Sequence, residues 1–376
     1  MSERMNPLEQ KIAGKIRKEG PITFETFMDM ALYEPDLGYY ASEDIEIGRA
    51  GDFYTSQHLH SVFGLMLGKQ LEEMWETMGR PSDFHAIEPG AGAALMAMDI
   101  LTYLKDRDIF SSCRYVIVEP RSFMQEKQKK LLGNYSGKVE WVNSLKDLGS
   151  KRGCILSNEL LDAFPVHLVD MEDELREIYV ALEDHNFRET EGALSTAALG
   201  DYLREFSIDL PRGYRTEINL RIKNWIESAG EVLSEGFILT IDYGYPAQDY
   251  YSEERNRGTL LCYHKHRVSE DVYLNIGEQD ITAHVNFSSL RKWGEELGFK
   301  TLGFCQQGIY LMSLGIDEVI KDLYTDSHDY LFEVAKIKRL IFPGTLGETH
   351  KVMVQYKGNG DPKLRGFGMK NQKDRL

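Results

Sequence analysis

The alternation of apolar and polar positions divides the chain into short strand-like runs and longer stretches with helical spacing. Apolar runs predict strands near 84–88, 114–119, 138–142, 153–158 and 237–242. Stretches with helical spacing separate these runs, and strands that alternate with helices form a parallel sheet. The pattern therefore predicts an α/β protein with a doubly wound, mostly parallel, Rossmann-like sheet.

Helical spacing also runs through 7–32, interrupted by a Gly-Pro pair, and through 60–78. The segment 33–56 between them is loop-like and dense in glycine and tyrosine. We therefore expect an N-terminal helical and loop extension over 1–80 that contributes to the active site. The sheet-bearing domain is expected over 81–376.

The sheet-bearing domain is expected to contain two insertions, at about 165–215 and 243–287, the first with an antiparallel strand pair. The remaining predicted elements are helices at 217–234 and 288–297 and strands at 301–305, 308–312 and 351–356. The tail after residue 357 is rich in glycine, lysine and arginine, so we expect it to be loosely ordered.

The chain is acidic, since 60 Asp and Glu against 44 Lys and Arg give a net charge of −16 over 376 residues. Nucleic-acid binding needs a basic surface, so nucleic acid is excluded as the main partner. Apolar runs stay shorter than a membrane span, and the first residues contain no apolar core of a signal peptide. We therefore expect no membrane binding.

The cysteine and histidine patterns bear on compartment and metal binding. Four widely spaced cysteines predict buried free thiols in a reducing compartment, and the protein is expected to be cytoplasmic. The pairs His58/His60 and His264/His266 lack a nearby cysteine or carboxylate cluster, so no metal site is predicted.

The stretch from Phe84 to Leu95 joins an apolar strand, a glycine-rich turn and a helix-forming run. This order is typical of the first strand, turn and helix of a nucleotide-binding fold. Gly90 and Gly92 allow the backbone to approach a ligand where a Cβ would collide. The motif alone leaves open a simple tight turn between strand and helix.

Two details separate this turn from dinucleotide sites. The dinucleotide fingerprint needs a small residue where this chain has Leu95. Glu88 would repel a pyrophosphate but attract the ammonium and sulfonium groups of S-adenosylmethionine. Glu119, which ends the next predicted strand, can accept both ribose hydroxyl protons; a solvated strand-end acid is the alternative. We predict a donor site of Glu88, Gly90, Ala91, Gly92, Glu119 and Asn143, the last of which follows the strand 138–142.

A second polar cluster follows the predicted strand 153–158 and begins with Asn158. Ligands in such sheets bind beyond the carboxyl ends of the strands, so Glu159 and Asp162 are expected beside the methyl donor. Such an acid pair suits a guanidinium, whose donors form a rigid planar fork. The alternative is that both are ordinary acids at a helix N-terminus. We predict Asn158, Glu159 and Asp162 as the catalytic residues.

Six blocks of the chain form a distinctive set. They are Leu37–Tyr40, Gly51–Ser56, Glu88–Gly92, Asn158–Pro165, Ile241–Gly244 and Gly277–Phe287. With these blocks the chain resembles, over nearly its whole length, the MidA family of S-adenosylmethionine-dependent methyltransferases. Mitochondrial members of that family are protein arginine methyltransferases that act in respiratory complex I assembly.

The resemblance implies a class I methyltransferase fold, S-adenosylmethionine as cofactor, and a protein substrate for which a respiratory-complex subunit is a candidate. It adds Thr55 and Ser56 to the donor-binding residues and places the Asn158 block toward the acceptor. Two positions depart from the family pattern: Gln57 replaces a proline, and Ala94 replaces the last small residue of the glycine loop.

The leading interpretation is an enzyme that methylates an arginine of a partner protein. Two alternatives stay open: a methyltransferase with a small-molecule acceptor, and an assembly chaperone that binds the donor without essential catalysis. The sequence does not specify the oligomeric state.

Overall fold

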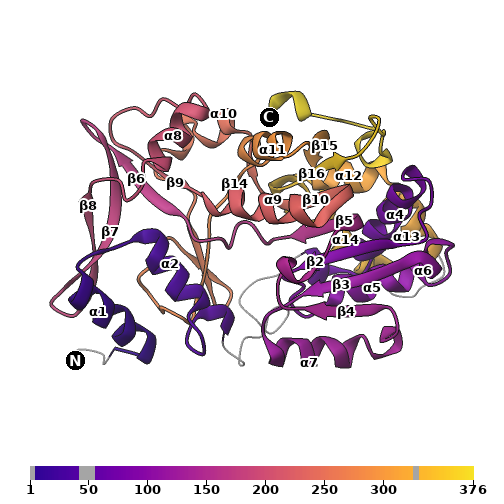
Figure 1. Ribbon diagram of the computed structural model, residues 1–376, viewed down its shortest axis with the longest axis horizontal. Coiled ribbons are helices and arrows are strands. Elements are labelled where there is room, and N and C mark those ends of the chain that lie inside the picture. Colours follow the sequence, from indigo (N-terminus) through magenta and orange to yellow (C-terminus); the bar gives the residue numbers. More distant parts are fainter. Residues whose placement is uncertain (1–4, 42–55, 325–329) are drawn as a thin grey trace. The chain divides into compact units, whose positions relative to one another are not determined.

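The computed structural model describes residues 5–41, 56–324 and 330–376 (Figure 1). The chain divides into two compact units. Unit 1 comprises 1–53, 161–224 and 245–289, and unit 2 comprises 54–160, 225–244 and 290–376. Both units are therefore assembled from three separate stretches of sequence.

Unit 2 contains the predicted doubly wound sheet. Its strands are β2 (Phe84–Pro89), β3 (Cys113–Val118), β4 (Val139–Val142), β5 (Lys151–Asn158), β10 (Leu233–Tyr245), β15 (Lys300–Gln306) and β16 (His350–Lys357). Their order in the sheet is β15-β16-β10-β5-β2-β3-β4. The strands from β10 to β4 are parallel, and β16 is antiparallel to both β10 and β15. This confirms the predicted class I methyltransferase architecture.

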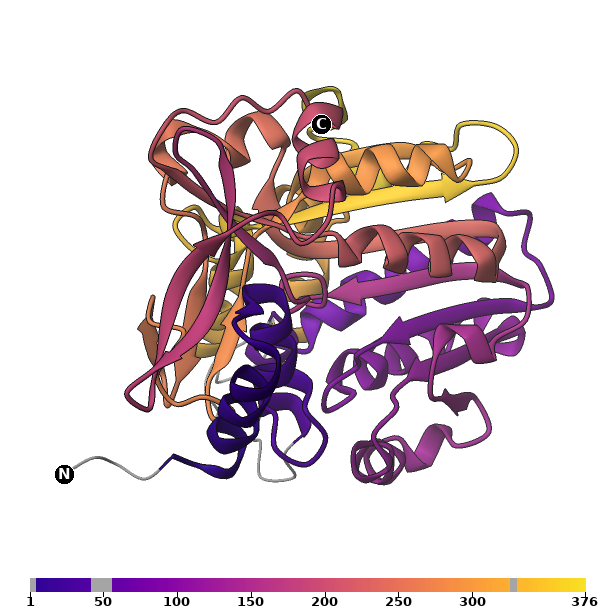
Figure 2. The same cartoon turned by 60° about the vertical axis from the view of Figure 1, so that its left-hand side comes forward.

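Helices flank this sheet (Figures 1 and 2). They are α3 (Ser56–Leu59), α4 (Val62–Thr77), α5 (Leu95–Leu104), α6 (Ile109–Ser112), α7 (Ser122–Leu131), α12 (Gln307–Ser313), α13 (Ile316–Tyr324), α14 (Tyr330–Ile341) and α15 (Leu346–Thr349). Two further helices, α9 (Arg221–Val232) and α11 (Phe287–Glu296), run across the division between the units. Every residue of β2 is buried, as expected for a central strand covered on both faces.

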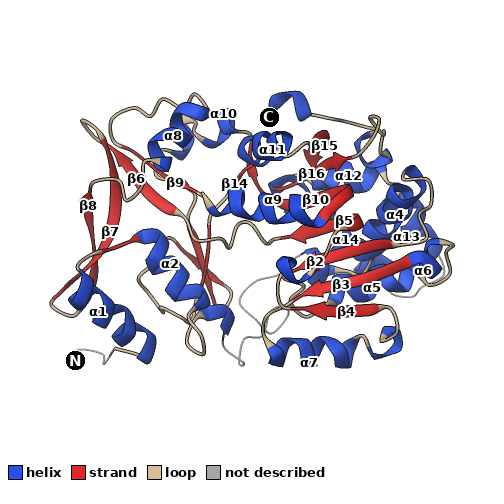
Figure 3. Cartoon of the chain, in the orientation of Figure 1, coloured by secondary structure: helices blue, strands red, loops and turns tan. Residues whose placement is uncertain are grey.

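Unit 1 is built on antiparallel strands (Figure 3). One sheet has the order β1-β7-β6-β9, with β8 paired to β7, and a second has the order β12-β11-β13. The strands of the unit are β1 (Ile22–Thr23), β6 (His167–Met171), β7 (Leu175–Glu183), β8 (Asn186–Gly192), β9 (Tyr214–Ile218), β11 (Leu261–His264), β12 (Arg267–Ser269), β13 (Asp280–Thr282) and β14 (Val285–Asn286). Its helices are α1 (Pro7–Glu19), α2 (Phe24–Tyr33), α8 (Ala198–Glu205) and α10 (Ala247–Tyr250).

Each unit has its own hydrophobic core. In unit 1, the apolar faces of α1 and α2 (Leu8, Ile12, Phe27) pack with strand residues such as Leu168 and Ile178. In unit 2, α4, α5 and the central strands supply the core. All four cysteines are buried free thiols, as predicted, and burial raises the pKa of Cys113, Cys262 and Cys305 to about 12. Within the described residues, the helices lack the length and hydropathy needed to cross a membrane.

Two predictions of local structure are wrong. The run 308–312, predicted as a strand, lies in α12, where Gly308 and Leu311 are buried three positions apart on one helix face. The tail after 357, predicted to be loosely ordered, is packed: Leu364 and Phe367 are buried, and the Gln372 N–H donates to the Phe304 carbonyl (2.7 Å). Tertiary packing overrode the local signals in both places.

Candidate functional site

The predicted glycine turn connects β2 to α5 in unit 2. Gly90 (φ 67°), Gly92 (φ 51°) and Ala94 (φ 60°) all have a left-handed backbone. The Gly90 N–H donates to the Val118 carbonyl (3.2 Å) and ties the turn to β3. Ala94 adopts a conformation that glycine tolerates better, so this departure from the family pattern has a small conformational cost. No described side chain caps the start of α5, so its first N–H groups can meet an anionic group of a ligand.

A buried glutamine that sequence reasoning missed forms a hydrogen bond to the turn. The Nε2 of Gln128, on α7, donates to the Gly92 carbonyl (2.9 Å). Its Oε1 accepts a hydrogen bond from the Trp141 indole (3.0 Å). Gln128 is fully buried, so it fixes the second glycine relative to α7 and β4.

Glu88 lies on β2 just before the turn, and its side chain is buried. The Tyr115 hydroxyl on β3 donates to its Oε2 (2.5 Å). Burial raises the pKa of Glu88 to about 7, an effect that the Tyr115 hydrogen bond partly offsets. Its charge at neutral pH therefore depends on a cation nearby, which the donor's ammonium and sulfonium groups would supply.

Glu119 follows β3 and is fully buried. Its Oε1 accepts hydrogen bonds from the backbone N–H (3.0 Å) and Nε (2.7 Å) of Arg121, and its Oε2 accepts from Arg121 Nη2 (2.8 Å). A carboxylate has about four lone-pair sites, so these three contacts leave roughly one for a ribose hydroxyl. Binding both hydroxyls requires Arg121 to give up a contact, a constraint that the sequence analysis missed.

Two of the remaining predicted donor residues, Asn143 and Ser56, lie at the edges of this region. Asn143 follows β4, and its Oδ1 accepts from Gln125 Nε2 (3.2 Å) on α7. Thr55 lies outside the described residues. Ser56 is fully buried, and its backbone N–H donates to Glu159 Oε1 (3.2 Å). Ser56 is therefore directly tied to the predicted acceptor cluster.

Glu159 follows β5 with φ 49°, a left-handed conformation that is uncommon for a residue other than glycine. Its Oε1 receives the Ser56 N–H and Asn158 Nδ2 (3.4 Å), and it lies 3.4 Å from His350 Nε2. His350 is buried at the start of β16, almost two hundred residues further along the chain, and sequence reasoning did not identify it. Within the described part of the chain, these contacts all converge on Oε1 and leave Oε2 for another ligand.

Asp242 positions the turn that carries Glu159. Its Oδ2 accepts from the Leu160 N–H (3.2 Å), and the Glu159 N–H donates to the Ile241 carbonyl (2.9 Å). A Cβ added at Gly90 would lie 2.9 Å from Leu160 Cδ1. The structure thus brings the glycine turn and the Glu159 turn together at the carboxyl ends of β2, β5 and β10, where ligands bind in this fold.

Asp162 belongs to unit 1, where three of the distinctive sequence blocks meet. Asp162 is buried, and its carbonyl accepts from the Ala283 N–H (2.9 Å). The Tyr40 hydroxyl donates to Asp280 Oδ1 (2.8 Å). Burial, followed by Asp280, Tyr33 and Asp162, raises the pKa of Tyr40 well above its usual value. Asp162 therefore shares an acidic and aromatic environment with the blocks Leu37–Tyr40 and Gly277–Phe287.

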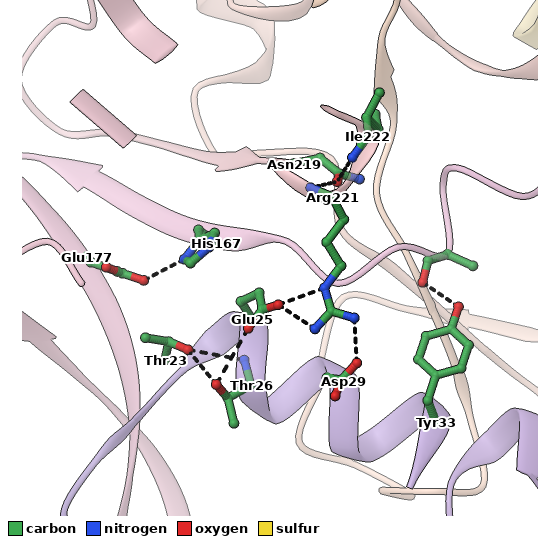
Figure 4. Close-up of polar contacts among 11 residues, drawn as sticks. Thr23, Glu25, Thr26, Asp29, Tyr33, His167, Glu177, Asn219, Arg221 and Ile222 are labelled. Carbon is green, nitrogen blue, oxygen red and sulfur yellow. Dashed lines mark hydrogen bonds and ion pairs between the residues drawn. The ribbon is translucent and has the colours of Figure 1, made fainter. Parts of the chain in front are cut away.

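An arginine clamp anchors α2 within unit 1 (Figure 4). Arg221 donates from Nε to Glu25 Oε1 (2.7 Å) and from Nη1 to Asp29 Oδ1 (2.6 Å), both on α2. The Tyr33 hydroxyl, one turn further along α2, donates to the Ala163 carbonyl (2.8 Å). The clamp thus fixes α2 against Arg221, and the Tyr33 hydrogen bond ties α2 to the segment that begins with Asp162.

The histidine pairs show no metal-binding arrangement in the part of the chain that is described. His60 is buried, accepts from the Val62 N–H at Nδ1 (2.9 Å) and contacts Glu333 through Nε2 (3.1 Å). His264 Nδ1 lies 2.7 Å from the Glu278 carbonyl oxygen. No group of three His, Cys, Asp or Glu among the described residues is arranged to hold a metal ion.

The strand order, the left-handed turn and the strand-end carboxylates define a class I methyltransferase. The residues fit S-adenosylmethionine: Gly90 and Gly92 leave the turn without bulk, α5 offers free N–H groups, and Glu88 and Glu119 are acidic. The model of the putative S-adenosyl-L-methionine-dependent methyltransferase family matches residues 66–305. The chain belongs to this family, and S-adenosylmethionine is its cofactor. The resemblance stated from the sequence is thereby confirmed.

Known proteins resemble nearly the whole chain. It is 28% identical to a Burkholderia thailandensis protein crystallised with S-adenosyl-homocysteine, with a TM-score of 0.90 and complete coverage of both chains. It is 25% identical to the Drosophila melanogaster homolog of the mitochondrial protein arginine methyltransferase NDUFAF7, covering 93% of this chain and 85% of that protein. The human NDUFAF7 is 27% identical, over 86% of this chain and 77% of that protein.

The NDUFAF7 relatives contradict the expected cytoplasmic location, because they are named as mitochondrial proteins. The expectation rested on the absence of an apolar leader and on buried free thiols. Free thiols persist in any reducing compartment, so they do not distinguish one such compartment from another.

Proposed function

We propose that this methyltransferase modifies an arginine guanidinium on a partner protein. The observation that carries the proposal is the geometry of Glu159. Its backbone is left-handed, its Oε1 is held by Ser56 and Asn158, and its turn packs against Gly90. A carboxylate held in this way presents Oε2 to a planar donor such as a guanidinium.

The bound donor supplies an electrophilic methyl group on sulfur. Glu159 orients the guanidinium and keeps its positive charge on the nitrogens that it contacts, so the remaining nitrogen has a lone pair for in-line attack. The new bond joins that nitrogen to the methyl carbon while the carbon–sulfur bond breaks and its electrons return to sulfur. The nitrogen then releases one proton. We assign Asn158 to orienting Glu159, and Asp162 to a second carboxylate contact with the acceptor.

The relatives named as protein arginine methyltransferases support a protein substrate. The resemblance to mitochondrial complex I assembly factors makes a respiratory-complex subunit the preferred candidate. The proposal also gives the segment 1–80 a part in the active site, through Ser56.

Methylation with isotope-labelled S-adenosylmethionine tests the proposal. A lysate from cells that lack the enzyme is incubated with the purified protein, and tryptic peptides are analysed by mass spectrometry. We expect labelled methyl groups on arginine in one or a few proteins. Label found only in small molecules would identify a small-molecule methyltransferase instead.

Glu159→Gln provides the matched control, because it keeps the shape of the side chain and removes its charge. We expect binding of S-adenosyl-homocysteine within about twofold of the wild type and arginine labelling reduced at least a hundredfold, the scale of a lost charge-assisted contact in the transition state. Unchanged labelling would remove Glu159 from the mechanism.

A further inference from the structure

The outward side of α14 carries large apolar side chains in unit 2. Leu331 is 81% exposed, Phe332 59% and Phe342 50%. Together with Ala335, Lys338 and Arg339, they form what we term the α14 stripe. Its spacing places the five helical residues on one side of α14, and Phe342, which directly follows the helix, continues that side because its N–H donates to the Lys338 carbonyl. The opposite side, with Ile337 and Leu340, is buried in the core. Within the described residues, the helix therefore has one apolar face in the core and a second apolar face that is exposed.

The charges of the α14 stripe indicate which kind of surface it would bind. Both of its charged residues, Lys338 and Arg339, are basic, although the chain has a net charge of −16. The Lys336 ammonium also lies 4.3 Å from the Phe332 ring centroid, but Glu333 on the same helix pairs with it (2.8 Å), so the charge of the stripe rests on Lys338 and Arg339. This combination favours an acidic surface with apolar anchors. Pairing of two copies through the stripe would oppose like charges. An anionic membrane would also match the basic residues, but the proposed function requires a protein that carries the acceptor arginine, so we select a protein surface as the occupant.

A buried hydrogen-bond chain connects α14 to Glu159. The Leu340 carbonyl accepts from Gln307 Nε2 (3.2 Å), and Gln307 Oε1 accepts from the Ser56 hydroxyl (3.1 Å). The Ser56 N–H then donates to Glu159 Oε1 (3.2 Å). Ser56 and Gln307 are fully buried, so α14 is held in a fixed relation to the acceptor carboxylate.

We propose that the α14 stripe is the docking surface for the protein that carries the acceptor arginine, and that it binds an acidic, apolar-anchored face of that protein. The inference rests on the proposed function. It adds a recognition surface outside the reacting groups, where binding energy lowers KM for a protein without changing the chemistry of a bound arginine.

The double substitution Leu331→Ser/Phe332→Ser removes the apolar anchors at exposed positions, where it should not disturb folding. The readout is methyl label from labelled S-adenosylmethionine on arginine in enzyme-deficient lysate. We expect at least a tenfold loss of label, with unchanged affinity for S-adenosyl-homocysteine. The matched control is Leu274→Ser, an equally apolar residue that is 51% exposed in unit 1, and it should label like the wild type.

A second variant, Lys338→Glu/Arg339→Glu, tests the charge of the stripe. At low salt, this variant should transfer less methyl label to arginine than the wild type, by a similar factor. At high salt, the difference in transferred label should become smaller because screening weakens exposed charge pairs. Sedimentation with phosphatidylglycerol vesicles and analytical ultracentrifugation test the two other occupants. Vesicle binding or dimerisation that the apolar double substitution abolishes would overturn the proposal.

The outcomes separate this inference from the proposed function. Equal arginine label from the wild type and from both α14 variants overturns the docking surface and leaves the proposed function intact. No labelled arginine with the wild type overturns both.

Discussion

The ends of two adjacent strands carry the same residue type with different hydrogen-bond partners. Glu88 on β2 and Glu119 after β3 are both buried glutamates at the carboxyl edge of one sheet. Glu88 has a neutral hydroxyl as its partner, and burial raises its pKa to about 7. Glu119 receives three hydrogen bonds from Arg121, two of them from the guanidinium. The two buried strand-end acids therefore differ in their hydrogen-bond partners rather than in their burial.

We therefore expect the two glutamates to have different roles in donor binding. A carboxylate with a fixed guanidinium is preorganised to accept hydroxyl protons. A carboxyl group that ionises near pH 7 responds to a cation that enters the site. The following predictions test this difference in roles, beginning with the largest expected effect.

Replacing Arg121 with glutamine should make Glu119 resemble Glu88. The buried carboxylate loses its cation, and the loss should cost about 3–4 kcal/mol of unfolding free energy at pH 8. Urea denaturation of the wild type and the variant at pH 8 measures this loss. A loss below about 1 kcal/mol, the range of an exposed ion pair, would show that Arg121 does not compensate a buried charge.

Glu88→Gln should have the opposite effect. The folded pKa of about 7 exceeds the ordinary value of 4.5, so the folded state binds more protons between these values and the wild type loses stability as pH rises through them. Removing the ionisable group should gain up to about 3 kcal/mol at pH 8 and little at pH 4.5. Denaturation across this range should give a flatter profile for the variant, and a profile parallel to the wild type would contradict the assigned pKa.

The affinity for S-adenosylmethionine should rise with pH because its positive charges favour ionised Glu88. With a pKa of about 7, the ionised fraction grows about eightfold between pH 6 and pH 7.5, and the affinity should follow. S-adenosyl-homocysteine lacks the sulfonium charge and should show a smaller change. Isothermal titration of the wild type and Glu88→Gln measures both. If the variant retains the full pH dependence, Glu88 is not its source.

Tyr115→Phe should give the smallest effect. The hydroxyl lowers the pKa of Glu88, so its removal should move the midpoint of the affinity profile upward by about one pH unit, which corresponds to about 1.4 kcal/mol. The same titration series detects this shift. A downward shift would mean that the hydroxyl stabilises the protonated carboxyl group.

The central strands could be predicted because they are buried on both faces and leave continuous apolar runs, as β2 and β5 show. The run 308–312 has the same local character, but packing against the core makes it a helix. The helix predicted at 217–234 begins at Arg221 because β9 occupies 214–218 and the Asn219 side chain accepts the Arg221 N–H.

The residues of the site also fall into those that could be predicted from the sequence and those that could not. The glycine turn and Glu159 were accessible from sequence because each follows a predicted strand directly. His350, Gln128 and Gln307 were not, since each reaches the site only through long-range packing. Arg121 lies two residues after Glu119, which was selected from the sequence. The sequence alone does not indicate that the Arg121 side chain turns back to contact this glutamate.

The position of β16 has a consequence for synthesis. It is the final strand of the chain, yet it lies inside the sheet between β10 and β15. β16 is the partner of β15 and of one edge of β10. Until residues 350–357 have left the ribosome, a nascent chain exposes these unpaired strand edges. A chain terminated before residue 350 would lack β16 and should be aggregation-prone. This holds even though such a chain contains residues 84–159, which include the glycine turn and Glu159. Methyltransferase activity is therefore expected only after residue 357 has been synthesised.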